Sequence, residues 1–156
     1  MVCEEVFSMK KNWIIAISLG IMTAFSSACL ATVSPEAISL GGVAPGDSIE
    51  QAKSILGTPS YSGHKMRFPS GIVIEVDNDR PGVVEEIKTK ANGPATPGGV
   101  TVGMGEDVLS QVYGSADKVD REHDGTEYVY YSTDRMKKME FKVVNGTITE
   151  IKCELH

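Results

Sequence analysis

Apolar and charged residues alternate strictly near the C-terminus of the chain. Every second residue from Met139 to Val143 is apolar and a charged residue stands between, which indicates a half-buried strand with one solvent-facing side. Asn145-Gly146 follows and is typical of a hairpin turn. We expect a bulge or a three-residue connection there, because that register places Phe141 opposite Ile151 and keeps both faces consistent.

The expected register also assigns side chains to the two faces of this hairpin. It sets Met139 opposite Cys153 on the buried face and Lys142 opposite Glu150 on the solvent-facing side. Cys153 is therefore predicted to be a small core residue, because a reactive thiol is typical of a partly exposed, electropositive site.

Two short stretches show the spacing of an amphipathic helix. In the first, Asp47 is predicted as the N-cap, the apolar residues fall on one face, and Gly57 ends the helix. In the second, acidic residues occupy the first turn and Gly114 ends the helix. Neither stretch is long enough to be helical alone, so each must pack on strands. The further segments with strand-like patterns are 65–68, 72–76, 83–90 and 126–132.

An ordered series of motifs occurs twice along the chain. Gly41–Gly46 recurs as Gly98–Gly103, and a Glu-Ile-Lys triplet follows later in both halves. The pattern predicts an α+β fold with two tandem helix-plus-three-strand repeats, which form an antiparallel sheet with the helices packed on one face. The predicted boundaries are 38–90 for the first repeat, 91–97 for a linker and 98–156 for the second repeat.

The N-terminal segment has the composition of an export signal. A basic stretch begins at Met9, the predicted true start, and is followed by the uncharged run Trp13–Phe25 and by small residues. Residues 1–31 are therefore predicted to be an export signal and 32–37 a short tether, since the uncharged run is too short to span a bilayer. Two forms of processing stay open: acylation of Cys29, as in bacterial lipoproteins, or ordinary signal-peptide cleavage nearby.

Composition and charge narrow the class of partner. The net charge is −6, and the chain lacks the lysines and arginines needed to neutralise phosphates, so no nucleic-acid partner is expected. The three cysteines cannot all pair, which excludes a disulfide scaffold. The apolar content is sufficient for a globular core, so the chain is not disordered as a whole.

Motifs for catalysis or cofactor binding are missing from the sequence. It contains no nucleophile elbow, no zinc-protease motif and no phosphate-binding loop. His64, His123 and His156 have no partner at metal-ligand spacing. An acidic run from Asp117 to Glu127 forms a solvated loop or binds a cation, and the loop is favoured. We therefore expect no enzyme activity, no catalytic, cofactor-binding or metal-binding residues, no cofactor and no small-molecule substrate.

Three tyrosines in one predicted strand are the candidate partner-binding residues: Tyr128, Tyr130 and Tyr131. Alternation puts Tyr128 and Tyr130 on one face of the strand and Tyr131 on the other. Whichever face is exposed offers an amphipathic patch suited to contact with another protein. Cross-strand packing inside a sheet is the alternative explanation for these residues.

The helical segments resemble those of a known family of envelope proteins. Gly103–Gly114 is similar to the helix signature of the SmpA/OmlA (BamE-like) lipoproteins, and Gly46–Gly57 has the same spacing between its glycines. Two such units in tandem also resemble the β-lactamase-inhibitor-protein fold, in which a concave sheet binds another protein. The resemblance covers residues 38–156, and the chain departs from single-unit members of the family in having two units.

The resemblance implies an exported protein of the bacterial cell envelope, in the outer membrane or periplasm, that binds another envelope or extracellular protein. It implies a lipoprotein that serves outer-membrane assembly or envelope maintenance and touches the membrane only through a lipid on Cys29. The alternative function is inhibition of an extracellular hydrolase, such as a β-lactamase-type enzyme.

Overall fold

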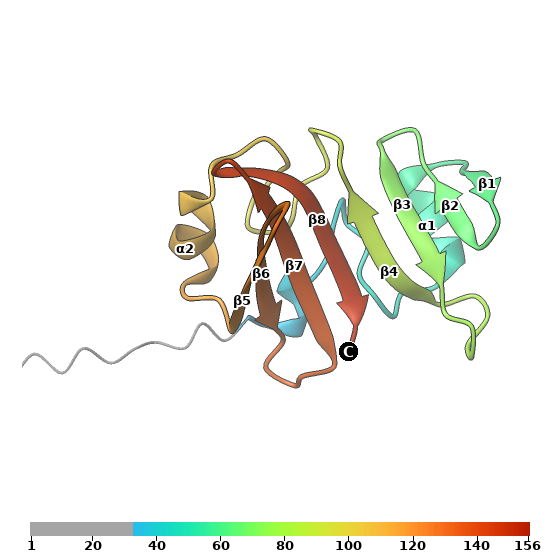
Figure 1. Cartoon of the computed structure of the whole chain (residues 1–156). Coiled ribbons are helices and arrows are strands. Elements are labelled where there is room, and N and C mark those ends of the chain that lie inside the picture. The colour runs from blue at the N-terminus through green and yellow to red at the C-terminus, as the bar shows by residue number, and fades with distance from the viewer. Residues whose placement is uncertain (1–32) are drawn as a thin grey trace, which may run out of the picture.

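The strands within residues 33–156 form one antiparallel sheet, in the order β1-β2-β3-β4-β8-β7-β6-β5 (Figure 1). The structure is a computed structural model that describes residues 33–156, so the predicted export signal and Cys29 lie outside the described residues. In chain order the elements are η1 (Pro35–Ala37), α1 (Ile49–Leu56), β1 (Ser60–Ser62), β2 (Lys65–Arg67), β3 (Ile72–Val76), β4 (Val84–Thr89), α2 (Asp107–Tyr113), β5 (Lys118–Glu122), β6 (Gly125–Tyr131), β7 (Lys137–Val144) and β8 (Thr147–Leu155).

The prediction of two tandem helix-plus-three-strand repeats is wrong. The described residues form one sheet of eight strands with two short α-helices, and β4 pairs directly with β8 at the centre of that sheet. Sequence reasoning missed β1 and β5, which are the two edge strands. Edge strands bury few side chains, so they lack a clear apolar alternation. The domain boundaries at residues 90 and 98 stay predictions.

The β7–β8 hairpin has the predicted register. Phe141 lies opposite Ile151 and Met139 lies opposite Cys153, and the pairing shifts by one residue close to the turn. The turn itself has two residues, Asn145-Gly146, with φ angles of 51° and 73°. Two successive positive φ angles match the right-handed twist of the flanking strands, which explains the Asn-Gly pair. The shift in pairing between Lys142 and Val143 confirms the predicted bulge.

The two helices end where the sequence predicts, but α1 begins with a different cap. Gly57 and Gly114 follow the last helical residues, with φ angles of 89° and 74° that favour glycine. The N-cap of α1 is Ser48, whose Oγ accepts a hydrogen bond from the Gln51 amide at 3.1 Å. Asp47 instead accepts a hydrogen bond from a loop amide through its carboxylate, so its predicted role as the N-cap is wrong.

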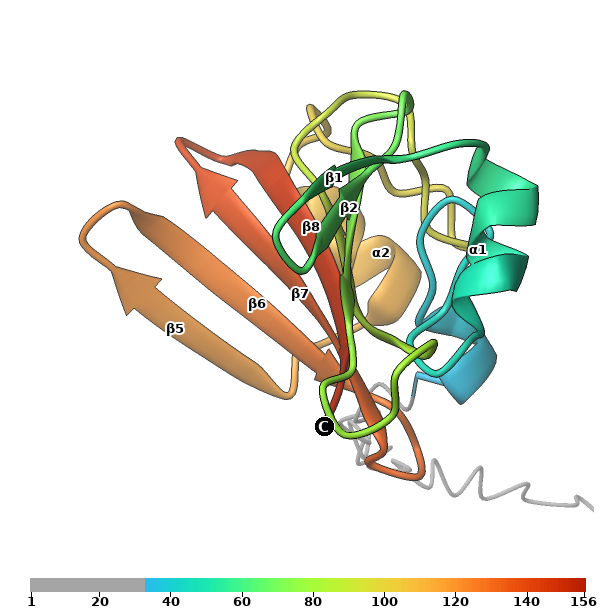
Figure 2. The ribbon, with the colours of Figure 1, turned by 90° about the vertical axis from the view of Figure 1, so that its right-hand side faces the viewer.

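Both helices pack on the same side of the sheet, as Figure 2 shows. Ile49 and Ala52 of α1 are buried there, as are Leu109 and Tyr113 of α2. These side chains join the inward-facing residues of the strands in one hydrophobic core. None of the helices within residues 33–156 is long and apolar enough to cross a membrane.

Three aromatic rings fill the core beneath α2. The centroid of the Tyr113 ring lies 5.4 Å from that of Tyr130 and 5.6 Å from that of Phe141. The Tyr113 hydroxyl donates a 2.6 Å hydrogen bond to Thr96 Oγ1, which satisfies its buried polar atom. Cys153 is fully buried in the same core, and burial raises the pKa of its thiol. The prediction that Cys153 is a small core residue is confirmed.

Candidate functional site

The side of the sheet opposite the helices is lined by charged side chains. Glu140 on β7 faces Lys152 on β8, and Lys152 in turn faces Lys88 on β4. None of the described helices covers this side (Figure 2), and we call it the open face. Lysines and glutamates gather on it because each strand directs every second side chain to this side.

Glu140 is the centre of an ion-pair network on the open face. Its exposed fraction is only 6%. Lys138 Nζ lies 2.7 Å from one carboxylate oxygen, and Lys152 contacts the other. Both lysines also pair with Glu154, at 2.6 and 3.2 Å. Burial alone would raise the pKa of Glu140, but the hydrogen bonds from Lys138 and Lys152 outweigh burial and hold that pKa below its ordinary value.

Glu127 of β6 is a neighbouring carboxylate with the opposite shift. Burial raises its pKa, and the nearby charge of Glu140 raises it further. Both carboxylates border a polar cavity of about 220 Å³ that Lys142 and Lys152 also line. Because this volume is below the roughly 300 Å³ of the smallest common ligand pockets, we interpret the cavity as a polar depression of the open face.

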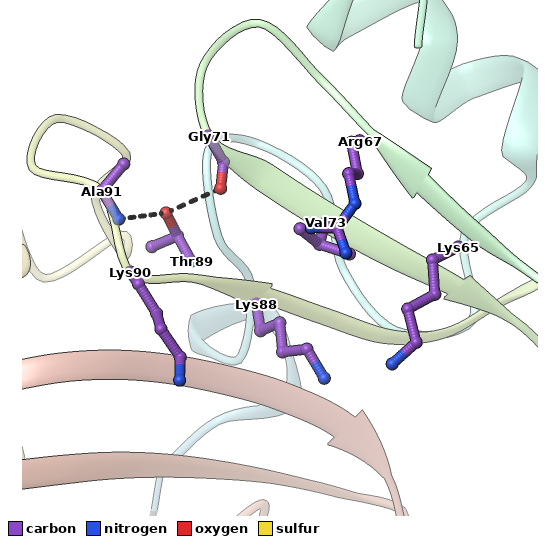
Figure 3. Close-up of a pocket in the computed structure, with 8 residues that line it drawn as sticks. All are labelled: Lys65, Arg67, Gly71, Val73, Lys88, Thr89, Lys90 and Ala91. Carbon is purple, nitrogen blue, oxygen red and sulfur yellow. Dashed lines mark hydrogen bonds between the residues drawn. The ribbon is translucent and has the colours of Figure 1, made fainter. Parts of the chain in front are cut away.

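A larger cavity of about 490 Å³ opens on the same face over β2, β3 and β4 (Figure 3). Lys65 and Arg67 of β2, Lys88 of β4 and Lys90 just after it surround this cavity, and Val73 of β3 lies between them. We call it the cationic groove. Its volume falls in the range of about 300–1,000 Å³ that is usual for ligand sites.

Two glutamates hold the lysines that lie deepest in the cationic groove. Lys65 Nζ lies 2.5 Å from Glu75, and Lys88 Nζ lies 3.1 Å from the same carboxylate oxygen and 2.5 Å from Glu86. The hydrogen bond from Lys65 lowers the pKa of Glu75 more than burial raises it. These contacts fix the ammonium groups on the floor of the groove before any ligand binds.

Arg67 and Lys90 are the more accessible cations of the groove. The Lys90 side chain is 74% exposed and meets Glu150 at 3.0 Å, a pair that contributes little in water. Arg67 is exposed and forms no ion pair with any residue of the segment 33–156. Its guanidinium group therefore keeps all of its hydrogen-bond donors available to a ligand.

The turn after β2 and the segment after β4 close one end of the cationic groove. Gly71 has a φ of 85°, and a Cβ atom there would lie 2.4 Å from Cβ of Ala91. The Thr89 hydroxyl donates to the carbonyl oxygen of Gly71 at 3.2 Å and accepts from the Ala91 amide at 3.0 Å. Glycine is required here for the close approach, and the hydrogen bonds fix the end of the groove.

The three candidate tyrosines lie in different environments. Tyr130 is 1% exposed in the core, so it cannot contact a partner, and its selection as a partner-binding candidate is corrected. Tyr128 lies on the helix side of the sheet and its hydroxyl donates to Glu106 at 3.0 Å. Tyr131 lies on the open face, where the Arg135 guanidinium stacks 5.0 Å from its ring centroid. Of the three, Tyr131 alone lies on the open face.

The acidic run at 117–127 forms an edge strand and the start of β6, so its interpretation as a loop is wrong. Asp120 pairs with Lys118 at 2.7 Å, and Asp124 pairs with Lys142 at 2.5 Å. These lysines neutralise two of the carboxylates. Among residues 33–156, no group of three or more His, Cys, Asp or Glu side chains is arranged to hold a metal ion.

Sequence reasoning did not single out the cationic groove. Lys65 and Arg67 alternate along one predicted strand, and Lys88 and Lys90 alternate along another, so a signal was present. The sequence does not show how β2 pairs with β3 and β3 with β4. That pairing sets the register that brings all four cations to one face.

No protein-family model matches this chain, and no curated protein matches it. A crystal structure of a DUF4309 family protein, YjgB, from Bacillus subtilis aligns with a TM-score of 0.50 over 70% of this chain and 79% of that one, at 16% identity. The two proteins share a fold. An extracellular protein containing a SCP domain from Bacillus anthracis aligns over 95% of this chain and 50% of that one, with a TM-score of 0.44 and 8% identity. At this score and identity, the second alignment carries no argument about fold or function.

Proposed function

We propose that this chain is an exported, non-catalytic protein-binding module of the bacterial cell envelope, and that the open face of its sheet is the binding surface. The observation that carries the proposal is the ion-pair network around Glu140, on a sheet face that no described helix covers. A face of charged side chains held in fixed positions is suited to recognise a complementary protein surface.

The ion pairs support binding because they hold the open face in one arrangement. Lys138 and Lys152 are each bound to two glutamates, so their side chains have already lost much of their rotational freedom in the free protein. A partner that meets these side chains avoids that entropic cost on association. Alternating charges also disfavour partners of the wrong pattern, which favours specificity.

The sequence supports the location and the class of the protein. Residues 1–31 have the pattern of an export signal, and Cys29 stands where either lipidation or nearby cleavage would follow. The resemblance of 46–57 and 103–114 to SmpA/OmlA lipoproteins favours a binding role in the envelope, including outer-membrane assembly or envelope maintenance. Inhibition of an extracellular hydrolase stays the alternative form of the same binding activity.

Capture of a partner from envelope extract, with paired variants on the two sides of the sheet, tests this proposal. Tyr131→Ala removes a half-buried ring on the open face, and Tyr61→Ala removes a 66% exposed ring from an edge strand, on the helix side. We expect Tyr131→Ala to weaken binding of the captured partner about 10-fold, because aromatic anchors concentrate binding energy, and Tyr61→Ala to leave it unchanged.

Both variants must keep the circular dichroism spectrum and the unfolding midpoint of the wild type for this comparison to count. A partner that binds Tyr131→Ala as tightly as wild type, or that loses affinity for Tyr61→Ala instead, would place the binding surface on another side and overturn the proposal.

A further inference from the structure

We propose that the cationic groove binds an acidic peptide segment of the partner, with a carboxylate on Arg67 and a second carboxylate on Lys90. This inference rests on the proposed function and names the chemistry that the open face recognises. It starts from the four cations that surround a single cavity of about 490 Å³.

The groove gathers positive side chains on a protein that is acidic overall. The chain carries a net charge of −6, so its average field repels an acidic ligand. Four cations line the groove, and three glutamates pair with its lysines: Glu75, Glu86 and Glu150. The local excess of positive charge lies at Arg67, which has no ion pair within residues 33–156. Arg67 therefore attracts an acidic segment to the groove despite the negative charge of the whole chain.

The accessible cations have the geometry that carboxylates require. The planar guanidinium of Arg67 binds a carboxylate through two parallel hydrogen bonds. Lys90 is held only by an exposed pair with Glu150, so an incoming carboxylate replaces that contact at little cost. Arg67 is on β2 and its side chain extends toward Val73, whereas Lys90 follows β4 on the far side of β3 (Figure 3). The two cations therefore bind two separated carboxylates.

The floor of the groove favours a peptide over a compact polyanion. Val73 and the methyl group of Ala91 line it together with the four cations, so the ligand meets apolar contact between its charged groups. Glu75 and Glu86 hold the deeper lysines, and they repel a ligand whose negative charges are dense. An extended segment in which acidic and aliphatic side chains alternate satisfies both conditions.

Fluorescence anisotropy with a labelled peptide tests the proposal directly. The probe is a peptide of alternating glutamate and leucine, and the matched control peptide has glutamine in place of glutamate. We expect the purified protein to bind the acidic peptide at low salt and not the glutamine peptide. Arg67→Ala and Lys90→Ala should each weaken binding about 10-fold, the loss of one charge-assisted contact. Lys118→Ala removes an exposed lysine from edge strand β5, outside the groove, and should leave the affinity unchanged.

Three results would overturn the inference: equal binding of both peptides, affinity unchanged in Arg67→Ala and Lys90→Ala, or displacement of the acidic peptide by an equimolar amount of inorganic polyphosphate. The last result would identify a phosphate-rich ligand instead. Failure here is distinguishable from failure of the proposed function. If the captured partner still depends on Tyr131 while the acidic peptide does not bind, only the assignment of the groove is wrong.

Discussion

Replacing Phe141 with alanine is expected to lower the free energy of unfolding by about 3–5 kcal/mol. The Phe141 ring is fully buried, and its centroid lies 5.6 Å from that of Tyr113 and 6.0 Å from that of Tyr130. Its removal leaves a cavity beneath α2 that the surrounding rings fill only in part, because protein interiors are close-packed. Urea unfolding followed by far-UV circular dichroism measures the change.

Lys142→Ala is the matched control, because Lys142 follows Phe141 on β7 and its side chain points to the open face. Its contact with Asp124 at 2.5 Å is an exposed ion pair, which contributes little to stability. We expect a change far smaller than that of Phe141→Ala. Similar losses in the two variants would show that the helix side and the open face have been assigned wrongly.

Glu140→Gln is expected to lower the free energy of unfolding by about 2 kcal/mol at neutral pH. Glu140 is 6% exposed and contacts both Lys138 and Lys152. Glutamine keeps the shape of the side chain but removes its charge. The ammonium groups of Lys138 and Lys152 then have Glu154 as their remaining ion-pair partner. Glu50→Gln is the control, since Glu50 is 84% exposed in an i,i+3 pair on α1 and should show little change.

The effect of Glu140→Gln should depend on pH. The pKa of Glu140 is below its ordinary value of 4.5 in the folded protein, so the stability it contributes is present above the unfolded pKa and is lost as pH falls through the folded pKa. The neighbouring Glu127, whose pKa is raised, has the opposite dependence. The difference between wild type and Glu140→Gln should therefore narrow as the pH falls below the ordinary glutamate value of 4.5 and through the lower pKa of folded Glu140. A difference that stays constant or widens would contradict the role of the Glu140 charge.

The sequence was most informative where two local signals agreed. The β7–β8 hairpin was predictable because strict alternation from Met139 to Val143 defines two faces, and Asn145-Gly146 permits few turn geometries. The burial of Cys153 followed from that register alone. Helix ends at Gly57 and Gly114 were predictable because glycine adopts positive φ at little cost.

Features that depend on contacts between distant segments were not predictable from pattern. The continuous sheet results from the pairing of β4 with β8, two strands with similar alternation but far apart along the chain. Alternation separated Tyr130 from Tyr131 but could not show which of them faces the core, since that depends on where α2 packs. The cationic groove needs three paired strands, so the alternation of its cations along two segments did not by itself indicate a site.

Lysine acetylation footprinting of the complex tests the central claim, that the open face binds the partner, most directly. Lys65, Lys88, Lys138 and Lys152 lie on the open face, and Lys53 of α1 lies on the helix side as an internal control. We expect the captured partner to slow acetylation of several open-face lysines while Lys53 reacts at its unbound rate. Protection of Lys53 with unchanged acetylation of the open-face lysines would contradict it.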